Sequence, residues 1–158
     1  AKGYRVYSYN TETKKYTTLK TLSGTSYVVT NLNSGTDYSY SVRAYGKVKN
    51  ETVWGSYSTV NTATVPAKVK LSSASVSDAG KAVLKWVKTA ADGYEIYMAT
   101  GTGQYKKIKT ITKNSTVTYS KGSLAKGKTY SFIVRAYKTV GDSKLYGDYS
   151  NVKSVSIK

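Results

Sequence analysis

The sequence predicts an all-β protein of two tandem β-sandwich modules, the first of which lacks its first two strands. Apolar and polar side chains alternate over short stretches, which is typical of strands with one buried face. Clusters of Gly, Ser, Asn and Asp separate these stretches, and no segment sustains a helical period. Most of the pattern also occurs twice, about 90 residues apart, which indicates one module present in two copies.

The repeat is clearest in one long segment of each copy. Leu32, Gly35, Tyr38, Tyr40, Val42, Arg43, Ala44 and Tyr45 recur as Leu124, Gly127, Tyr130, Phe132, Val134, Arg135, Ala136 and Tyr137. Three shorter matches flank this segment. Residues 3–7 recur as 93–97, residues 16–22 as 105–111 and residues 54–58 as 146–150. The single proline, Pro66, lies where the copies meet. We therefore divide the chain into module one (residues 1–66) and module two (residues 67–158).

Module two has enough chain for seven strands and no helix. Alternation is clear over residues 83–87, 94–98, 130–136 and 152–157. Turn-forming clusters at 77–81, 100–103, 112–115 and 141–144 separate the strands. Short alternating strands at this spacing favour a β-sandwich.

The long repeated segment resembles a known family. Leu124-x-x-Gly127-x-x-Tyr130-x-Phe132-x-Val134-x-Ala136-Tyr137 is similar to the E–F corner and strand F of fibronectin type III domains, which are immunoglobulin-like sandwiches, and the segment from Leu32 matches equally well. The resemblance implies that the Tyr130 hydroxyl hydrogen-bonds upstream backbone and that Trp86 anchors the core, so both should be buried. The Lys-rich, Tyr-rich composition, with Tyr-Gly-x-Tyr-Ser opening strand G, resembles repeats of secreted Gram-positive proteins. It implies a secreted or bacterial cell-surface location.

Module one is expected to be incomplete. Residues 67–92 precede Gly93 and hold strands A and B, whereas only Ala1 and Lys2 precede Gly3. Strands C, C′, E, F and G remain, but strand E would lack its sheet neighbours. The side chains left facing a half-empty interior are Tyr4, Val6, Tyr38, Tyr40, Val42 and Ala44. Either the chain is a fragment of a longer one, or a strand-donating partner or self-association through residues 1–66 completes the module.

The composition argues against an enzyme. The chain has no cysteine and no histidine, so disulfides, thiolate metal sites and a Ser–His triad are excluded. The eight acids form no repeated close pair of the kind that hydrolases use. We expect no catalytic residue, no cofactor, no metal site and no membrane span, since no apolar run approaches membrane-spanning length.

An outward face of Tyr and Arg is the candidate binding site. Alternation turns Tyr94 and Ile96 inward, and therefore sends Glu95 and Tyr97 outward. The candidate residues are Arg5, Tyr7, Arg43 and Tyr45 in module one and Tyr97, Arg135 and Tyr137 in module two. Trp54, in the loop between strands F and G, is a further candidate, and the alternative is that it packs against that loop. Exposed tyrosines beside arginine could stack on sugar rings or peptide aromatics. The alternative is that they form cross-strand pairs that only stiffen the sheet.

Two functions remain open on the sequence. One is a non-catalytic extracellular spacer or scaffold, joined to other domains of a longer parent chain. The other is a binding module for cell-wall glycan, anionic polymer or host protein. The net charge of +17 favours an anionic partner, but many lysines could simply solvate outer strand faces. Specific nucleic-acid binding is not expected, because 22 of the 25 basic residues are lysine rather than the bidentate arginine.

Polyanion binding, where it occurs, should be stronger in module two. Residues 67–158 carry 17 basic and 5 acidic residues, against 8 and 3 in residues 1–66. Because bound lysines release counterions from a polyanion, the affinity should fall steeply as the salt concentration rises. Salt-gradient elution of the separated modules from heparin checks this. Equal retention, or binding that salt leaves unchanged, would contradict it.

Overall fold

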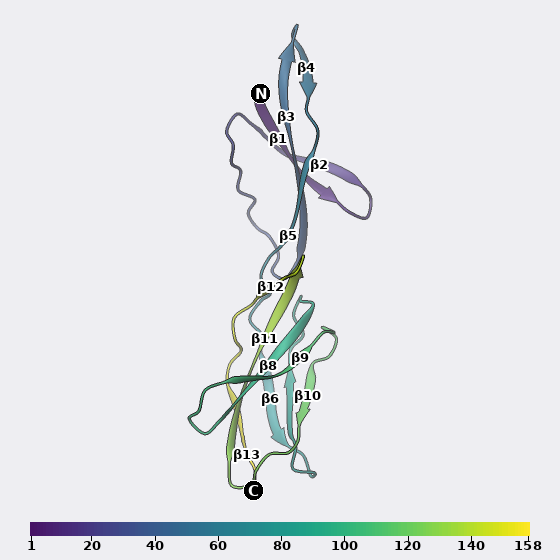
Figure 1. Cartoon of the computed structure of the whole chain (residues 1–158). Coiled ribbons are helices and arrows are strands. Elements are labelled where there is room, and N and C mark those ends of the chain that lie inside the picture. The colour runs from purple at the N-terminus through teal and green to yellow at the C-terminus, as the bar shows by residue number, and fades with distance from the viewer. The chain divides into compact units, whose positions relative to one another are not determined.

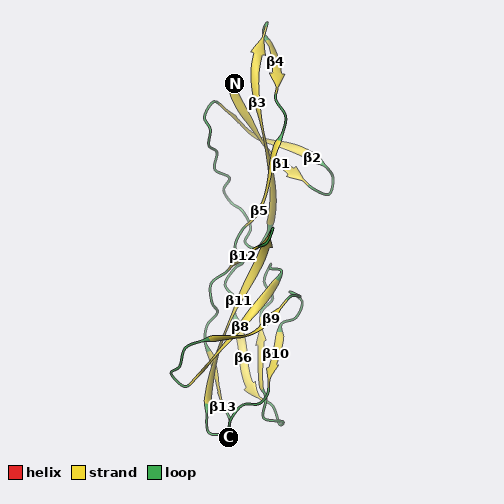
Figure 2. Cartoon of the chain, in the orientation of Figure 1, coloured by secondary structure: helices red, strands yellow, loops and turns green.

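The computed structural model describes residues 1–158 and consists of thirteen strands joined by turns and loops (Figures 1 and 2). Every strand pair is antiparallel. The structure contains no helix, and therefore none long and apolar enough to cross a membrane. The chain divides into unit 1, residues Ala1–Asn33 and Asp37–Thr64, and unit 2, residues Ser34–Thr36 and Val65–Lys158.

Unit 2 is a sandwich of two sheets. The three-stranded sheet has the order β10-β7-β6, formed by β6 (Leu71–Val76), β7 (Ala82–Trp86) and β10 (Thr118–Lys121). The five-stranded sheet has the order β12-β11-β8-β9, with β13 also paired to β11. Its strands are β8 (Gly93–Thr100), β9 (Lys106–Ile111), β11 (Thr129–Val140), β12 (Ser143–Tyr146) and β13 (Lys153–Ser156).

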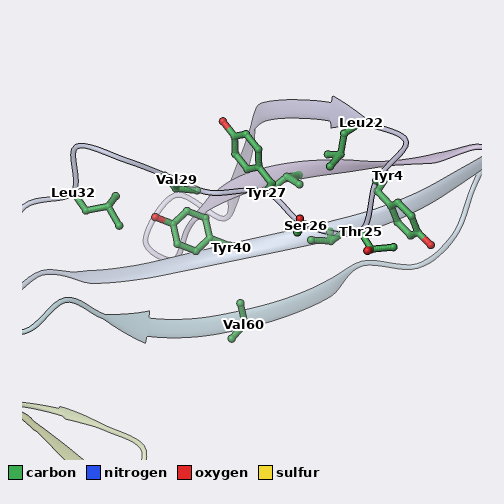
Figure 3. Close-up of a pocket in the computed structure, with 12 residues that line it drawn as sticks. Tyr4, Leu22, Thr25, Ser26, Tyr27, Val29, Leu32, Tyr40 and Val60 are labelled. Carbon is green, nitrogen blue, oxygen red and sulfur yellow. The ribbon is translucent and has the colours of Figure 1, made fainter.

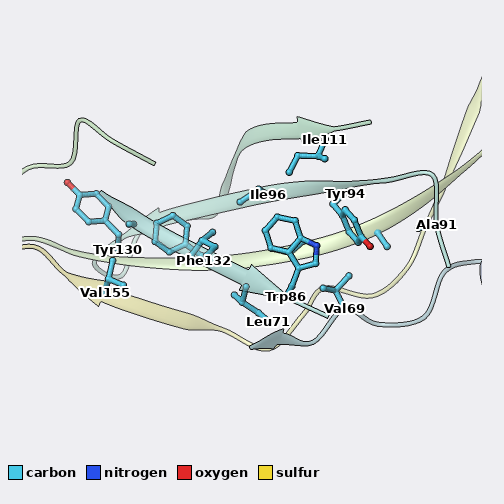
Figure 4. Packing of buried hydrophobic residues seen from close by; sticks show 14 of the residues in the cluster. Val69, Leu71, Trp86, Ala91, Tyr94, Ile96, Ile111, Tyr130, Phe132 and Val155 are labelled. Carbon is cyan, nitrogen blue, oxygen red and sulfur yellow. The ribbon is translucent and has the colours of Figure 1, made fainter. Parts of the chain in front are cut away.

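The core of unit 2 lies between these sheets (Figure 4). Trp86 is 4% exposed and packs edge-on against Tyr94, with 5.4 Å between ring centroids. The Tyr130 hydroxyl accepts a hydrogen bond of 2.9 Å from the Ala125 N–H, five residues upstream. The predicted burial of Trp86 and Tyr130 and the predicted tyrosine corner are therefore confirmed.

The prediction of seven strands in the second module is wrong, because β12 is an eighth. The 141–144 cluster was expected to be a turn, but β12 begins at Ser143, which pairs with Val140. β11 pairs with β13 near its start and with β12 near its end. Gly141 has φ +58° at the first position of the two-residue turn, which suits a type II′ hairpin.

Unit 1 is a single five-stranded sheet. Its strands are β1 (Gly3–Asn10), β2 (Lys15–Leu22), β3 (Asp37–Val48), β4 (Glu51–Trp54) and β5 (Ser58–Ala63), with the order β2-β1-β3-β4 and β5 paired to β3. The register repeats that of unit 2: Val6 pairs with Val42 as Ile96 pairs with Val134. The Tyr38 hydroxyl also accepts a 2.8 Å hydrogen bond from the Asn33 N–H, which forms a second tyrosine corner.

The expected strand E of module one is absent. In unit 2 the matching strand, β10, pairs with β7, but unit 1 has no such neighbour, so residues 25–30 form no ladder. This segment instead runs along the inner face of the sheet (Figure 3). Together they enclose an apolar groove of about 720 Å³, lined by Tyr4, Val6, Leu22, Gly24, Thr25, Ser26, Tyr27, Val29, Leu32, Tyr40, Val42 and Val60.

The inner face of unit 1 is covered less completely than that of unit 2. Val42 is 36% exposed, whereas its counterpart Val134 is fully buried. Tyr40 is half-buried where Phe132 is fully buried. A loop replaces a packed sheet here, so part of the apolar stabilisation is missing, about 1.5–3 kcal/mol for each large side chain left fully exposed.

Residues 1–66 expressed alone should be unfolded or self-associating. An apolar face of this size seldom stays open to water on a soluble monomer, so it should be covered by another chain or lose its order. Analytical ultracentrifugation and thermal unfolding over a range of concentrations measure both outcomes. A monomer that unfolds cooperatively at low concentration would contradict this prediction.

Candidate ligand-binding face

The candidate face is the outer side of each five-stranded sheet, opposite the core. In unit 2 the β8–β11 register brings Glu95 directly across from Arg135, and Tyr97 across from Ile133. In unit 1 the same register brings Arg5 across from Arg43, and Tyr7 across from Ser41. We call these surfaces the outer face of unit 2 and the outer face of unit 1.

Glu95 is the centre of the outer face of unit 2, and it is completely buried. Its Oε2 accepts hydrogen bonds from the Tyr97 hydroxyl (2.7 Å) and from Arg135 Nη2 (2.9 Å). Its Oε1 accepts three more, from Lys107 Nζ (3.2 Å), Tyr146 Oη (3.3 Å) and Lys144 Nζ (3.4 Å). The carboxylate is thus surrounded by three cations and two hydroxyls, all of them donors.

Aromatic rings cover this ion network. The Arg135 guanidinium lies 3.6 Å from the Tyr146 ring centroid, and about 5 Å from those of Tyr97 and Tyr149. Lys144 Nζ lies 3.9 Å from the ring centroid of Tyr137. Because Lys144 and Tyr146 belong to β12, the unexpected eighth strand is what closes the outer face of unit 2.

The network sets the protonation of its members. Burial alone would raise the pKa of Glu95, but the hydrogen bonds from Tyr97, Arg135 and Lys107 outweigh it and lower the pKa from 4.5 to about 2. Burial and the bond to Glu95 raise the pKa of Tyr97. At neutral pH Glu95 is therefore a fully bonded anion and is poorly suited to accept a proton. No group of three or more acidic side chains is placed to hold a metal ion.

Several candidate residues are more buried than alternation predicts. Tyr7 and Tyr137 are 7% and 4% exposed, so the expectation that they are exposed is wrong, as it is for Glu95. Tyr45, Tyr97 and Arg135 are half-buried. Alternation identifies which face a side chain lies on, but it does not show what packs over that face. The residues that complete the network and were not predicted are Lys107, Lys144, Tyr146 and Tyr149.

The outer face of unit 1 has two arginines and no carboxylate. Arg5 Nε donates to Thr21 Oγ1 at 3.0 Å. Arg43 Nε donates to the Gly55 carbonyl at 2.9 Å, and its Nη1 to the Tyr57 hydroxyl at 3.4 Å. All of these acceptors are neutral, so neither guanidinium has an anionic partner within the protein.

Stacked rings support the two arginines. Trp54 was expected in a loop, but it ends β4 and is half-buried. Its ring centroid lies 4.5 Å from Arg5 Cζ and 5.2 Å from Arg43 Cζ. The Tyr57 ring centroid lies 4.5 Å from Arg43 Cζ and 4.1 Å from the parallel ring of Tyr16. The structure thus brings Arg5, Arg43 and Trp54 together and adds Tyr16 and Tyr57, which the sequence did not single out.

Comparisons with known proteins bear on the fold. No protein-family model and no curated protein matches the sequence. Among solved structures, the FN1-FN3 domains of chicken CNTN1 match with a TM-score of 0.52 and 15% identity, over 99% of this chain and 56% of that one. A two-domain fibronectin type III segment from chicken tenascin matches with a TM-score of 0.48 and 18% identity, and the match covers 97% of this chain and 82% of that one. The structure of FN3tt mut matches with a TM-score of 0.43 and 23% identity, and the match covers 59% of this chain and 97% of that one.

The comparison with the chicken CNTN1 domains establishes the architecture. At 15% identity the similarity shows the fold alone, and that fold is all-β with tandem fibronectin type III-like modules. The predicted fold class is therefore confirmed.

Replacing Glu95 by Gln should destabilise unit 2 by about 2–3 kcal/mol at pH 7, because three cations would lose their buried anion while remaining partly solvated. Since the folded pKa is lowered, the contribution of the ionised Glu95 is complete above pH 4.5 and is lost as the pH falls towards 2. The difference between Glu95→Gln and the parent chain should shrink over that pH window. Chemical denaturation of the intact chain at several pH values measures it.

The matched control is Asp148→Asn, which removes the same charge from an exposed side chain. Its effect should stay within about 0.5 kcal/mol. The network contributes little to the stability of unit 2 if the two substitutions lower the free energy of unfolding equally, or if the effect of Glu95→Gln on it does not change with pH.

Proposed function

We propose that these fibronectin type III-like modules are non-catalytic extracellular spacers, which hold other domains of a secreted or bacterial cell-surface protein apart. The observation that carries this proposal is that the chain enters unit 2 at one end of its central strand and that the last strand of unit 2 ends at the other. A module connected in this way adds its length to the protein in which it lies.

In unit 2 the two ends are separated along β11. At one end, Pro66 lies beside Gly147, so close that a Cβ added to Gly147 would clash with the Pro66 carbonyl. The Gly147 N–H in turn donates a 3.0 Å hydrogen bond to the Ala136 carbonyl of β11. At the other end, the Ile157 N–H donates to the Lys128 carbonyl at 3.0 Å. Eight residues of extended chain separate Lys128 from Ala136, roughly 26 Å at about 3.3 Å per residue.

In unit 1 the start of β1 and the end of β5 are likewise separated along β3. Gly3, at the start of β1, pairs with Tyr45. Ala63, at the end of β5, pairs with Asp37. Eight residues separate Asp37 from Tyr45, which again corresponds to roughly 26 Å.

A side chain next to the last strand of unit 2 hydrogen-bonds to the backbone of the first strand. Asn151, just before β13, accepts a 3.0 Å hydrogen bond from the Leu71 N–H and donates a 2.9 Å bond to the Leu71 carbonyl. Tension applied at the two ends would draw β6 and β13 past each other, so several interactions would have to break together. Such an arrangement suits a module that must keep its length under load.

A non-catalytic role is also supported by the state of the acidic residues. Both carboxylate oxygens of Glu95 accept hydrogen bonds within the ion network. Asp92 accepts hydrogen bonds from Lys138 Nζ (2.8 Å) and the Thr139 N–H (2.7 Å). These two bonds outweigh burial and lower the pKa of Asp92. Both carboxylates are therefore occupied in holding the sheet of unit 2.

Stretching the intact chain by its two ends tests the spacer proposal. Unit 2 should unfold in a single event, with a gain of about 300 Å in chain length at about 3.4 Å per residue. Asn151→Ala should lower the unfolding force, whereas Thr102→Ala, in an exposed turn, should leave it unchanged. Gradual extension without a force peak would contradict a load-bearing role.

A second candidate function is favoured by the two arginines on the outer face of unit 1. Arginines that lack an internal anion are suited to bind one from outside, such as a cell-wall glycan, another anionic polymer or a host protein. This function is compatible with a spacer, because it uses only the outer face of unit 1.

A further inference from the structure

One position distinguishes the outer faces of the two units. In unit 2, Glu95 lies across from Arg135; in unit 1, Arg5 lies at the matching position, across from Arg43. Lys107, which faces Tyr97, is replaced by Thr18, which faces Tyr7. The lysine at 144 likewise has threonine, Thr52, as its counterpart. The internal carboxylate and two of its three cations are thus absent from unit 1, and a second guanidinium is added.

Two of the five side chains that donate to the carboxylate in unit 2, Arg135 and Tyr97, have counterparts of the same type in unit 1, and these bond to no carboxylate. Arg135 Nη2 bonds to Glu95, but Arg43 Nη2 donates to no protein atom. The Tyr97 hydroxyl bonds to Glu95, but the Tyr7 hydroxyl makes no hydrogen bond and only packs against Tyr16 and Tyr57. Both Nη atoms of Arg5 are also without a partner in the protein.

We propose that the outer face of unit 1 binds the carboxylate of an acidic polysaccharide, of the kind built from hexuronic acids. The ligand carboxylate would take the place that the Glu95 carboxylate holds in unit 2. It would accept hydrogen bonds from Arg43 and the Tyr7 hydroxyl, and from Arg5 as the added cation. The inference rests on the second candidate function and names its ligand.

The choice of carboxylate follows from the internal comparison. Unit 2 shows that a guanidinium and a tyrosine hydroxyl at these positions hold a planar, singly charged carboxylate at 2.9 and 2.7 Å. The arginine forks match that geometry with two parallel N–H groups. In unit 1 the two arginines are directly opposite each other in the strand register, and like charges at such positions destabilise a sheet. A bound anion would remove that cost.

The choice of a sugar follows from the rings beside the arginines. Tyr16 and Tyr57 are 38% and 40% exposed and stack in parallel, with an interplanar angle of 9°. Their faces are covered by each other, by Tyr9 and by Arg43, so their exposed parts are ring edges and hydroxyl groups, which can hydrogen-bond the hydroxyls of a sugar. Tyr57 also contacts Arg43, so a sugar bound at these edges would have its carboxylate within reach of the guanidiniums.

Titration calorimetry of the intact chain with a hexuronic acid oligomer tests the proposal, with a neutral hexose oligomer of the same length as the comparison. At physiological ionic strength, which screens distant surface charges, the acidic oligomer should bind and the neutral one should not. Arg5→Glu gives unit 1 the carboxylate found in unit 2, so it should weaken binding at least tenfold while the fold is kept. Lys20→Glu makes the same change of charge at an exposed site on the other side of the sheet and should leave the affinity within about twofold.

Tyr7→Phe keeps the test decisive if Arg5→Glu disturbs the fold. It removes only the hydroxyl and retains the ring packing, and it should weaken binding about tenfold, as expected for the loss of a hydrogen bond to a charged group. Amide NMR spectra of each variant show whether unit 1 remains folded.

Other results would overturn the proposal, and they separate its failure from that of the binding function. Binding of polyphosphate or poly-glutamate through Arg5, without binding of the sugar, would refute the ligand but keep the binding function. Equal losses in Lys20→Glu and Arg5→Glu would show attraction by overall charge alone. If no anion binds, both the proposed ligand and the binding function are refuted. The stacked rings of Tyr16 and Tyr57 would then have only a structural role.

Discussion

The antiparallel register of two central strands, β8 with β11 in unit 2 and β1 with β3 in unit 1, is the constraint on which both faces of the sheet depend. Because side chains alternate, the register that sets Ile96 beside Val134 in the core also sets Glu95 beside Arg135 outside it. A shift of one residue would bury the ion pair in the core and expose the apolar pair. The core and the ion network of unit 2 therefore fix the same register from opposite sides of the sheet.

The comparison between the units separates what this register determines from what it does not. Val6 and Val42 keep the inner-face pairing of Ile96 and Val134, and both tyrosine corners form. However, full burial of the inner face requires the second sheet, which only unit 2 has. Strand E shows the same dependence, because residues 25–30 have the sequence of a strand but no partner with which to form one.

The fold could be predicted from the sequence because its signals are local. Alternation, turn clusters and the repeated corner motif identified the central strands and the burial of Trp86 and Tyr130. The candidate face was predicted only in part. Alternation placed Arg5, Arg43 and Tyr97 on the outer side, but the burial of Tyr7, Tyr137 and Glu95 depends on segments distant in sequence that fold over them. The one available signal was the recurrence of residues 54–58 as 146–150, a segment whose tyrosines in unit 2 are Tyr146 and Tyr149.

The charge at the Glu95 position gives the two outer faces different properties on the same scaffold. In unit 2 the anion is built in, so the arginine, the lysines and the tyrosine hydroxyls are satisfied and the face is closed. In unit 1 the arginines stack on Trp54 and Tyr57, and these cation–π contacts, about 0.5–2 kcal/mol each, offset part of the repulsion between them. They do not supply an acceptor for the free N–H groups. The change from acid to base at this position, together with the loss of the two lysines, thus replaces a self-contained stabilising network by a face on which two arginines have no internal anion.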